Sequence, residues 1–216
     1  MAKFSTIEVI SAAVAVYRKN GNKIIATGNH NEGGDNTNRT LLDAILAKKK
    51  DAIKVTEDDI AMAETIINDL QQRGMIAGLK GSAVSDFTAR AIAMCNEEQM
   101  SGYNIGISTW IPKLHADMQA EDVIQHELNM IAFGSKYIGK IGDKVEINFV
   151  PVVVRYNTNY NVWRHTGHDG QGNLVGFLKK DKIDVPTRIK GCVKTQNESR
   201  YTKGKTTIFN YVKVIK

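Results

Sequence analysis

The sequence has few residues of the kinds that mark secreted, membrane and fibrous proteins. Its 216 residues include only 2 cysteines and 3 prolines, and no Cys or His neighbours either cysteine at metal-binding spacing. This scarcity excludes a disulfide scaffold and favours two buried free thiols, Cys95 and Cys192, in a reducing compartment. No apolar run approaches the roughly 18 to 20 residues of a membrane span, and no segment resembles a signal peptide. We therefore expect no membrane association and a cytoplasmic location, in the host cytoplasm if the source is viral.

Catalytic and metal-binding motifs are also lacking. The segment SRYTKGKT at residues 199–206 ends like a phosphate-binding loop, but it lacks the first glycine and precedes a strand pattern instead of a helix. His126 and Glu127 lack the second histidine of a zinc protease, because position 130 is methionine. We therefore predict no enzymatic activity, no cofactor and no metal.

Charge is distributed unevenly along the chain, whose net charge is +6. Up to Gly134 there are 13 Lys and Arg against 17 Asp and Glu, and after it there are 16 against 6. Such segregation is typical of a polyanion-binding module joined to an acidic partner domain. A solvated basic surface without a ligand is the simpler alternative.

Before Gly134 the apolar residues recur at helical spacing. The stretch from Ile7 to Tyr17 has one apolar face and follows two candidate caps, Ser5 and Thr6. A second helix begins after Thr56, with Asp59 in the capping-box position. Further helices are predicted at 41–47, 86–96 and 119–133, and a Gly- and Asn-rich loop at 28–38. These patterns predict an α-helical domain over residues 1–134.

After Gly134 the apolar period changes to two. The predicted strands are 145–156, with Pro151 at an edge or bulge, 160–166, 173–178, 187–195 and 206–215. Five short strands over residues 135–216 predict a small β-barrel of OB type, although an SH3-like barrel fits the number of strands almost as well. The fold class is therefore α+β, with a helical domain followed by a five-stranded OB-like barrel.

Alternation on the last two predicted strands separates an inner from an outer face. The inner positions are Ile189, Gly191, Val193, Thr195, Ile208, Val212 and Val214. The outer positions are Arg188, Lys190, Cys192, Lys194, Phe209, Tyr211 and Lys213. One outer face thus combines cations with aromatic rings, as a sequence-tolerant groove for a single strand requires.

Two neighbouring segments add residues of the same kinds. Tyr156, Tyr160, Trp163, Arg164 and His165 form a second basic and aromatic cluster, and a hairpin supplies further cations and a tyrosine. The predicted nucleic-acid-binding residues are Tyr156, Tyr160, Trp163, Arg164, Lys190, Lys194, Arg200, Tyr201, Lys203, Lys205, Phe209, Tyr211 and Lys213. The alternative for each strand aromatic is a place in the core. If Phe209 and Tyr211 are core residues, the stacking platform moves to Tyr160 and Trp163.

The barrel segment resembles the OB-fold-like domains of bacteriophage replication and single-stranded-DNA-binding proteins. The resemblance lies in residues 139–146, 156–163, 189–194 and 206–214. It implies a non-catalytic protein that binds single-stranded DNA, or RNA, in phage DNA replication, recombination or repair. The alternative is a protein-interaction factor whose acidic helical domain binds a host or phage enzyme, with the barrel as a nucleic-acid tether.

Overall fold

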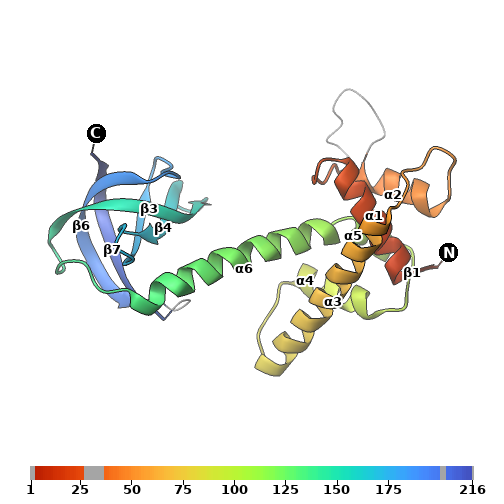
Figure 1. Ribbon diagram of the computed structural model, residues 1–216, viewed down its shortest axis with the longest axis horizontal. Coiled ribbons are helices and arrows are strands. Elements are labelled where there is room, and N and C mark those ends of the chain that lie inside the picture. The colour runs from red at the N-terminus through yellow and green to blue at the C-terminus, as the bar shows by residue number, and fades with distance from the viewer. Residues whose placement is uncertain (1–2, 27–36, 200–202, 216) are drawn as a thin grey trace. The chain divides into compact units, whose positions relative to one another are not determined.

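The computed structural model describes residues 3–26, 37–199 and 203–215 (Figure 1). The chain divides into two compact units, Met1–Gln119 and Ala120–Lys216. The division lies N-terminal to Gly134, where the period of the sequence changes, because the second half of one helix packs on the barrel. Most of the loop predicted at 28–38 lies outside the described residues.

Helices come first along the chain and the barrel strands follow, which confirms the predicted α+β fold class. The helices described are α1 (Thr6–Lys19), α2 (Asn38–Leu46), α3 (Glu57–Lys80), α4 (Asp86–Asn96), α5 (Tyr103–Ser108) and α6 (Ile111–Gly134). The strands are β1 (Phe4–Ser5), β2 (Gln99–Met100), β3 (Lys144–Asn157), β4 (Val162–His168), β5 (Leu174–Lys179), β6 (Thr187–Glu198) and β7 (Lys205–Val214). Within the described ranges, no helix has the length and apolar character needed to cross a membrane.

Helix α1 is the centre of the first unit. Its residues from Val9 to Val16 are buried, and it packs against α2, α3 and α5. Ser5 caps its N-terminus by accepting a hydrogen bond from the backbone N–H of Glu8, as the sequence predicts. Because these helices cover α1 on several sides, its apolar residues are spread around the helix and are not confined to one stripe.

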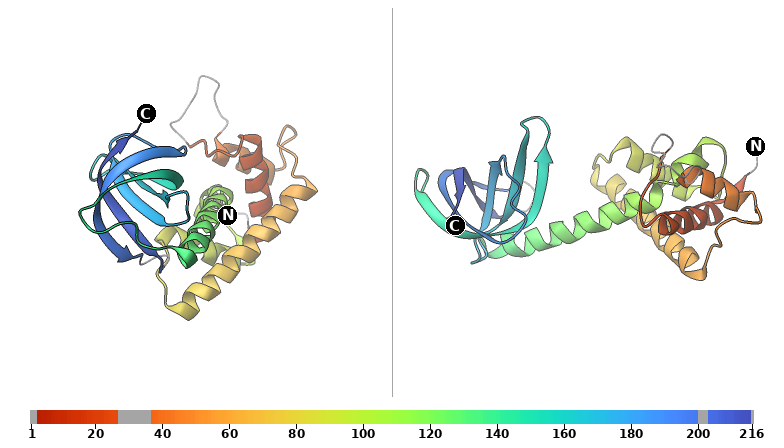
Figure 2. Two further views of the ribbon diagram at one scale, coloured as in Figure 1. Left: turned by 60° about the vertical axis from the view of Figure 1, so that its left-hand side comes forward. Right: turned by 90° about the horizontal axis from the view of Figure 1, so that it is seen from above.

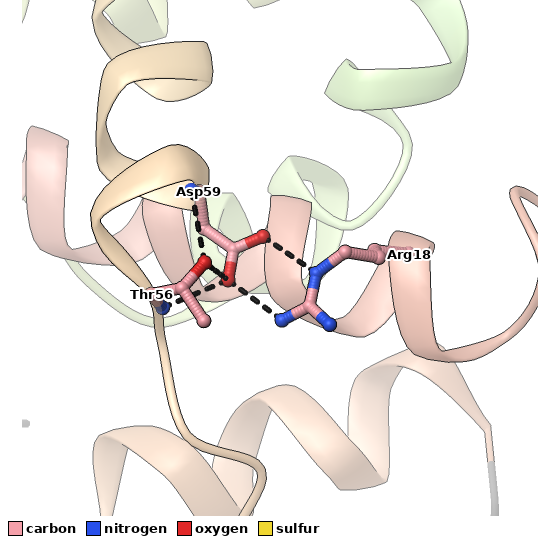
Figure 3. A network of polar contacts seen from close by, with 3 residues as sticks. All are labelled: Arg18, Thr56 and Asp59. Carbon is pink, nitrogen blue, oxygen red and sulfur yellow. Dashed lines mark hydrogen bonds and ion pairs between the residues drawn. The ribbon is translucent and has the colours of Figure 1, made fainter.

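The start of α3 is tied to α1 through Asp59 (Figure 3). The predicted capping box is confirmed: Thr56 Oγ1 accepts from the Asp59 N–H at 3.3 Å, and Asp59 Oδ2 accepts from the Thr56 N–H at 2.9 Å. The Arg18 guanidinium donates to both carboxylate oxygens at 2.9 and 2.8 Å. These hydrogen bonds hold the pKa of Asp59 below its usual value, and the hydrogen bond from Arg18 has the largest effect.

The second unit is built on a closed barrel in the order β3-β4-β5-β7-β6. All neighbours are antiparallel except β5 and β7, which run parallel. The long strand β3 closes the barrel, because its first half pairs with β6 and its second half with β4. The register shifts between Pro151 and Val153, at the predicted bulge. This mixed five-stranded barrel is consistent with an OB-like fold.

Aromatic rings fill the barrel interior. Phe149, Phe177 and Phe209 are buried with aliphatic residues of β5, β6 and β7. His165 stacks on Phe177 with ring centroids 4.6 Å apart, and its Nε2 accepts the N–H of Ile183 at 2.9 Å. Burial lowers the pKa of His165, so the ring is neutral near pH 7.

The C-terminal half of α6 covers part of the outer face of the barrel (Figure 2). Leu128 and Ala132 pack on Leu174 of β5, with Ile124, Ile131, Val152 and Val153 beside them. Just after the helix, Ser135 Oγ donates to the carbonyl of Lys205 at 2.5 Å and accepts the N–H of Leu174 at 2.8 Å. The helix is thereby fixed to β5 and β7.

Candidate nucleic-acid interface

A groove of about 490 Å³ lies on the outer face of β4, β5 and β7. Its floor follows from the strand register, in which Arg155 pairs with Arg164, Arg164 with Leu178, Thr166 with Gly176, and Gly176 with Ile208. Residues of α6 form one wall of the groove, namely Glu121, Ile124, Gln125 and Leu128. The floor is therefore apolar and small at its centre, with two arginines at one side.

Gly176 keeps the centre of the floor low. A Cβ at this position would lie 2.9 Å from Cδ1 of Ile208, which is too close for any larger residue without a shift of that side chain. Glycine inside a strand often marks a place where a ligand or another backbone approaches closely. The adjacent Leu178 is exposed, so apolar surface faces the opening.

Two connections of the barrel border the groove. Asn157 at the end of β3 and Ser199 and Thr206 beside the β6–β7 connection are among its lining residues. The β6–β7 connection also contains Lys203, and Lys205 is the first residue of β7. The Lys205 Nζ lies 5.7 Å from the ring centroid of Tyr137. The predicted residues Arg200 and Tyr201 belong to the same connection and lie outside the described residues.

Arg164 is exposed and has no ion pair with any residue that the structure describes. Its neighbour Arg155 pairs with Glu121 of α6. On the outer side of β6, by contrast, Lys190 and Arg188 donate to the Glu146 carboxylate at 2.9 and 3.1 Å. These cations lower the pKa of Glu146, Lys190 most strongly, and Glu146 offsets part of their charge.

The aromatic cluster forms where β3 turns into β4. Tyr156 and Trp163 are in contact, with ring centroids 5.1 Å apart, and the Lys182 Nζ lies 5.5 Å from the Trp163 centroid. Tyr160 lies in the connecting turn and is 73% exposed, so its ring is open to stacking. His165 was predicted in this cluster, and that prediction is wrong, because its ring is fully buried in the barrel and stacks on Phe177.

Phe209 faces the core and is 3% exposed, so its predicted outward position is wrong. The reason is a β-bulge in β7, where Tyr211 and Val212 together oppose Gly191 and Tyr211 has a φ of 51°. The extra residue breaks the alternation, so Phe209 and Val212 both point inward. Ile208, predicted inward, lines the groove instead.

The remaining outward predictions on β6 and β7 agree with the structure. Lys190, Lys194, Tyr211 and Lys213 are exposed, and Tyr211 is 83% exposed. None of the four lines the groove on β4, β5 and β7. The structure therefore separates the predicted residues into a groove set around Arg164, an aromatic set around Trp163, and a third set on β6 and the end of β7.

The residues that shape the floor are Arg155, Thr166, Gly176, Leu178 and Ile208, and none of them is among the predicted binding residues. Alternation on the second and third predicted strands of the barrel contained part of the signal, because Arg164 and Thr166 share one face, as do Gly176 and Leu178. Their importance depends on the order of the strands, which alternation alone does not reveal.

The two thiols differ in their surroundings. Cys95 is buried, and burial raises its pKa to about 12. Cys192, predicted buried, is partly exposed, and both thiols are free. In the part of the chain that the structure describes, no three His, Cys, Asp or Glu residues are grouped as a metal site.

Comparison with protein-family models, curated proteins and solved structures found no match for this chain.

Proposed function

We propose that this protein binds single-stranded DNA, without catalysis, in the groove on the outer face of β4, β5 and β7. The observation that carries the proposal is the position of the groove: it lies on one sheet face of an OB-like barrel, between the β3–β4 and β6–β7 connections. The corresponding face and loops of OB barrels are those that bind oligonucleotides.

The composition of the groove supports a single strand as the ligand. In the groove, phosphates would meet Arg164 and bases would contact the apolar floor near Leu178. Tyr160, Lys203 and Lys205 do not line the groove but lie in or next to the connections that border it, where they would extend the contact with the strand. The groove volume of about 490 Å³ is in the range of pockets that hold one small organic molecule. A single nucleotide is a molecule of that size. The resemblance to phage replication proteins supports a role in DNA replication, recombination or repair.

A protein-interaction role for the helical unit is the second candidate. The last turns of α3 expose Met75, Ile76 and Leu79, and the start of α4 exposes Phe87. Exposed apolar side chains in one region are typical of protein-binding surfaces. This surface is compatible with DNA binding by the barrel, since it lies in the other unit.

Fluorescence anisotropy with a labelled oligothymidylate tests the proposal, using Arg164→Gln and the matched control Arg188→Gln. We expect tighter binding of the single strand than of a duplex of equal length. The slope of log affinity against log salt should be negative, by about 0.7 for each phosphate contact. Arg164→Gln should weaken binding several-fold and make that slope shallower by about 0.7, whereas Arg188→Gln, paired with Glu146, should change affinity less than about twofold.

Equal or tighter binding of the duplex, or an affinity that does not depend on salt, would contradict a single-strand groove. A larger loss from Arg188→Gln than from Arg164→Gln would place the contact on β6 instead. If neither the single strand nor the duplex binds at low salt, the barrel is not a nucleic-acid-binding module.

A further inference from the structure

Two arginines stand directly opposite each other at the edge of the groove. Arg155 of β3 and Arg164 of β4 are register partners, and alternation directs both side chains to the outer face. Like charges in this arrangement repel, because directly opposed side chains on antiparallel strands are neighbours. A fold gains nothing from such a pair unless an anion lies between or beside the two guanidinium groups.

In the free protein, one carboxylate already provides negative charge beside this pair. Glu121 of α6 accepts a hydrogen bond from Arg155, whereas Arg164 has no acidic partner within the described residues. Glu121 precedes Ile124, Gln125 and Leu128 on the helix face that lines the groove. Because Leu128 packs on Leu174, the helix holds the carboxylate next to the arginines.

The contact between Glu121 and Arg155 is open to competition. The side chains of Arg155 and Glu121 are 58% and 53% exposed, so water reaches both charges. An exposed ion pair of this kind adds little stability. A phosphate carries the same kind of charge as the carboxylate, and guanidinium groups bind it through two parallel hydrogen bonds.

We propose that Arg155 and Arg164 form a phosphate-binding pair for one phosphodiester of the bound strand, and that this phosphate displaces the Glu121 carboxylate from Arg155. The inference rests on the proposed function and adds the position of one backbone phosphate. Glu121 acts as an internal competitor, so the free protein keeps Arg155 neutralised until a strand enters the groove.

Glu121→Gln in the full chain removes the competitor while keeping the size of the side chain. We expect this variant to bind oligothymidylate about two- to fivefold more tightly at low salt, which is the range that an exposed ion pair can contribute. The gain should shrink as salt rises, because salt screens exposed charges. Thermal melting should be unchanged, since both side chains are exposed.

Glu127→Gln is the matched control. Glu127 is exposed on the same helix, does not line the groove and has no ion pair with the residues described. Its replacement changes the net charge by the same amount as Glu121→Gln, but at a position away from the arginines. We expect no more than a marginal gain in affinity. A second control repeats Glu121→Gln in an Arg155→Gln background, where the gain should disappear because the two substitutions act on one contact.

The outcomes separate this inference from the proposed function. Equal gains from Glu121→Gln and Glu127→Gln, or a gain that persists without Arg155, would show a general charge effect and overturn the phosphate pair. A loss of affinity in Glu121→Gln would mean that Glu121 orients Arg155 for binding, which also overturns competition. If the wild type binds and Arg164→Gln weakens binding, but Glu121→Gln leaves the affinity unchanged, only the inference fails. If neither wild type nor Glu121→Gln binds, both fail.

Discussion

Replacing Phe209 with alanine is expected to lower the free energy of unfolding of the barrel by about 3 to 5 kcal/mol. The ring is buried in the aromatic core and covers Gly191, where a Cβ would lie only 3.1 Å from it. Close packing leaves the surrounding strands little freedom to fill the space, so the substitution creates a cavity. Chemical denaturation of the full chain, followed by near-UV circular dichroism, measures the loss.

Tyr211→Ala is the matched control for Phe209→Ala. The two aromatics lie two residues apart on β7, but Tyr211 is exposed, so its removal should change the free energy of unfolding by less than about 0.5 kcal/mol. Unchanged stability in Phe209→Ala together with weaker DNA binding would contradict the structure. It would support the outward position that simple alternation predicts.

Asp59→Ala is expected to destabilise the helical unit by about 1 to 3 kcal/mol. The substitution removes the carboxylate of the capping box at the start of α3, which accepts the Thr56 N–H, and it removes the partner of Arg18, whose own side chain is half exposed and can be hydrated. Asp58→Ala is the control, because Asp58 is an exposed neighbour in the same helical turn and takes no part in the capping box. Denaturation followed by far-UV circular dichroism compares the two variants.

The contribution of Asp59 should also depend on pH. Its pKa is lower in the folded protein than its unfolded value of about 3.9, so the unfolded state binds the proton more readily. The stabilisation is complete above about pH 5 and is lost as the pH falls through the folded-state pKa. The difference in stability between wild type and Asp59→Ala should therefore narrow on acidification. A constant difference between pH 7 and pH 3 would contradict the assigned role.

Local signals predicted the elements and several of their ends. Helix α4 matches the predicted range of 86–96, and the capping box at Thr56 is present because its hydrogen bonds need only residues within one turn. The short helix α5 was missed, since six residues give too little periodicity to detect. The brief β1–β2 pair was missed for the same reason.

The faces of the strands were predicted less well. On β6 Ile189 and Val193 are inside as expected, but the register with β7 shifts between Val193 and Thr195. Thr195, predicted inward, therefore pairs with Ile208, which lines the groove. On β7 the bulge at Tyr211 inverts the order for Ile208 and Phe209. A bulge depends on how β7 pairs with β6, and the β7 sequence contains no glycine to mark it.

The candidate site was predicted only in part, because it depends on tertiary contacts. Arg164 and the aromatic residues near it could be chosen by type, but Arg155 was missed because its importance comes from its register with β4. The wall formed by α6 follows from contact between Leu128 and Leu174, which are far apart in sequence. An amphipathic helix pattern shows which side is apolar, but does not show what covers it.

The most direct test of the proposed interface is a two-dimensional amide NMR titration of the full chain with oligothymidylate. Binding in the groove predicts the largest shifts at Arg164, Thr166, Gly176, Leu178 and Ile208, with smaller changes at Lys190 and Lys213. It also predicts that amides in the core of the helical unit remain unperturbed. Shifts centred on Lys190, Lys194 and Lys213, or confined to the helical unit, would contradict the groove on β4, β5 and β7.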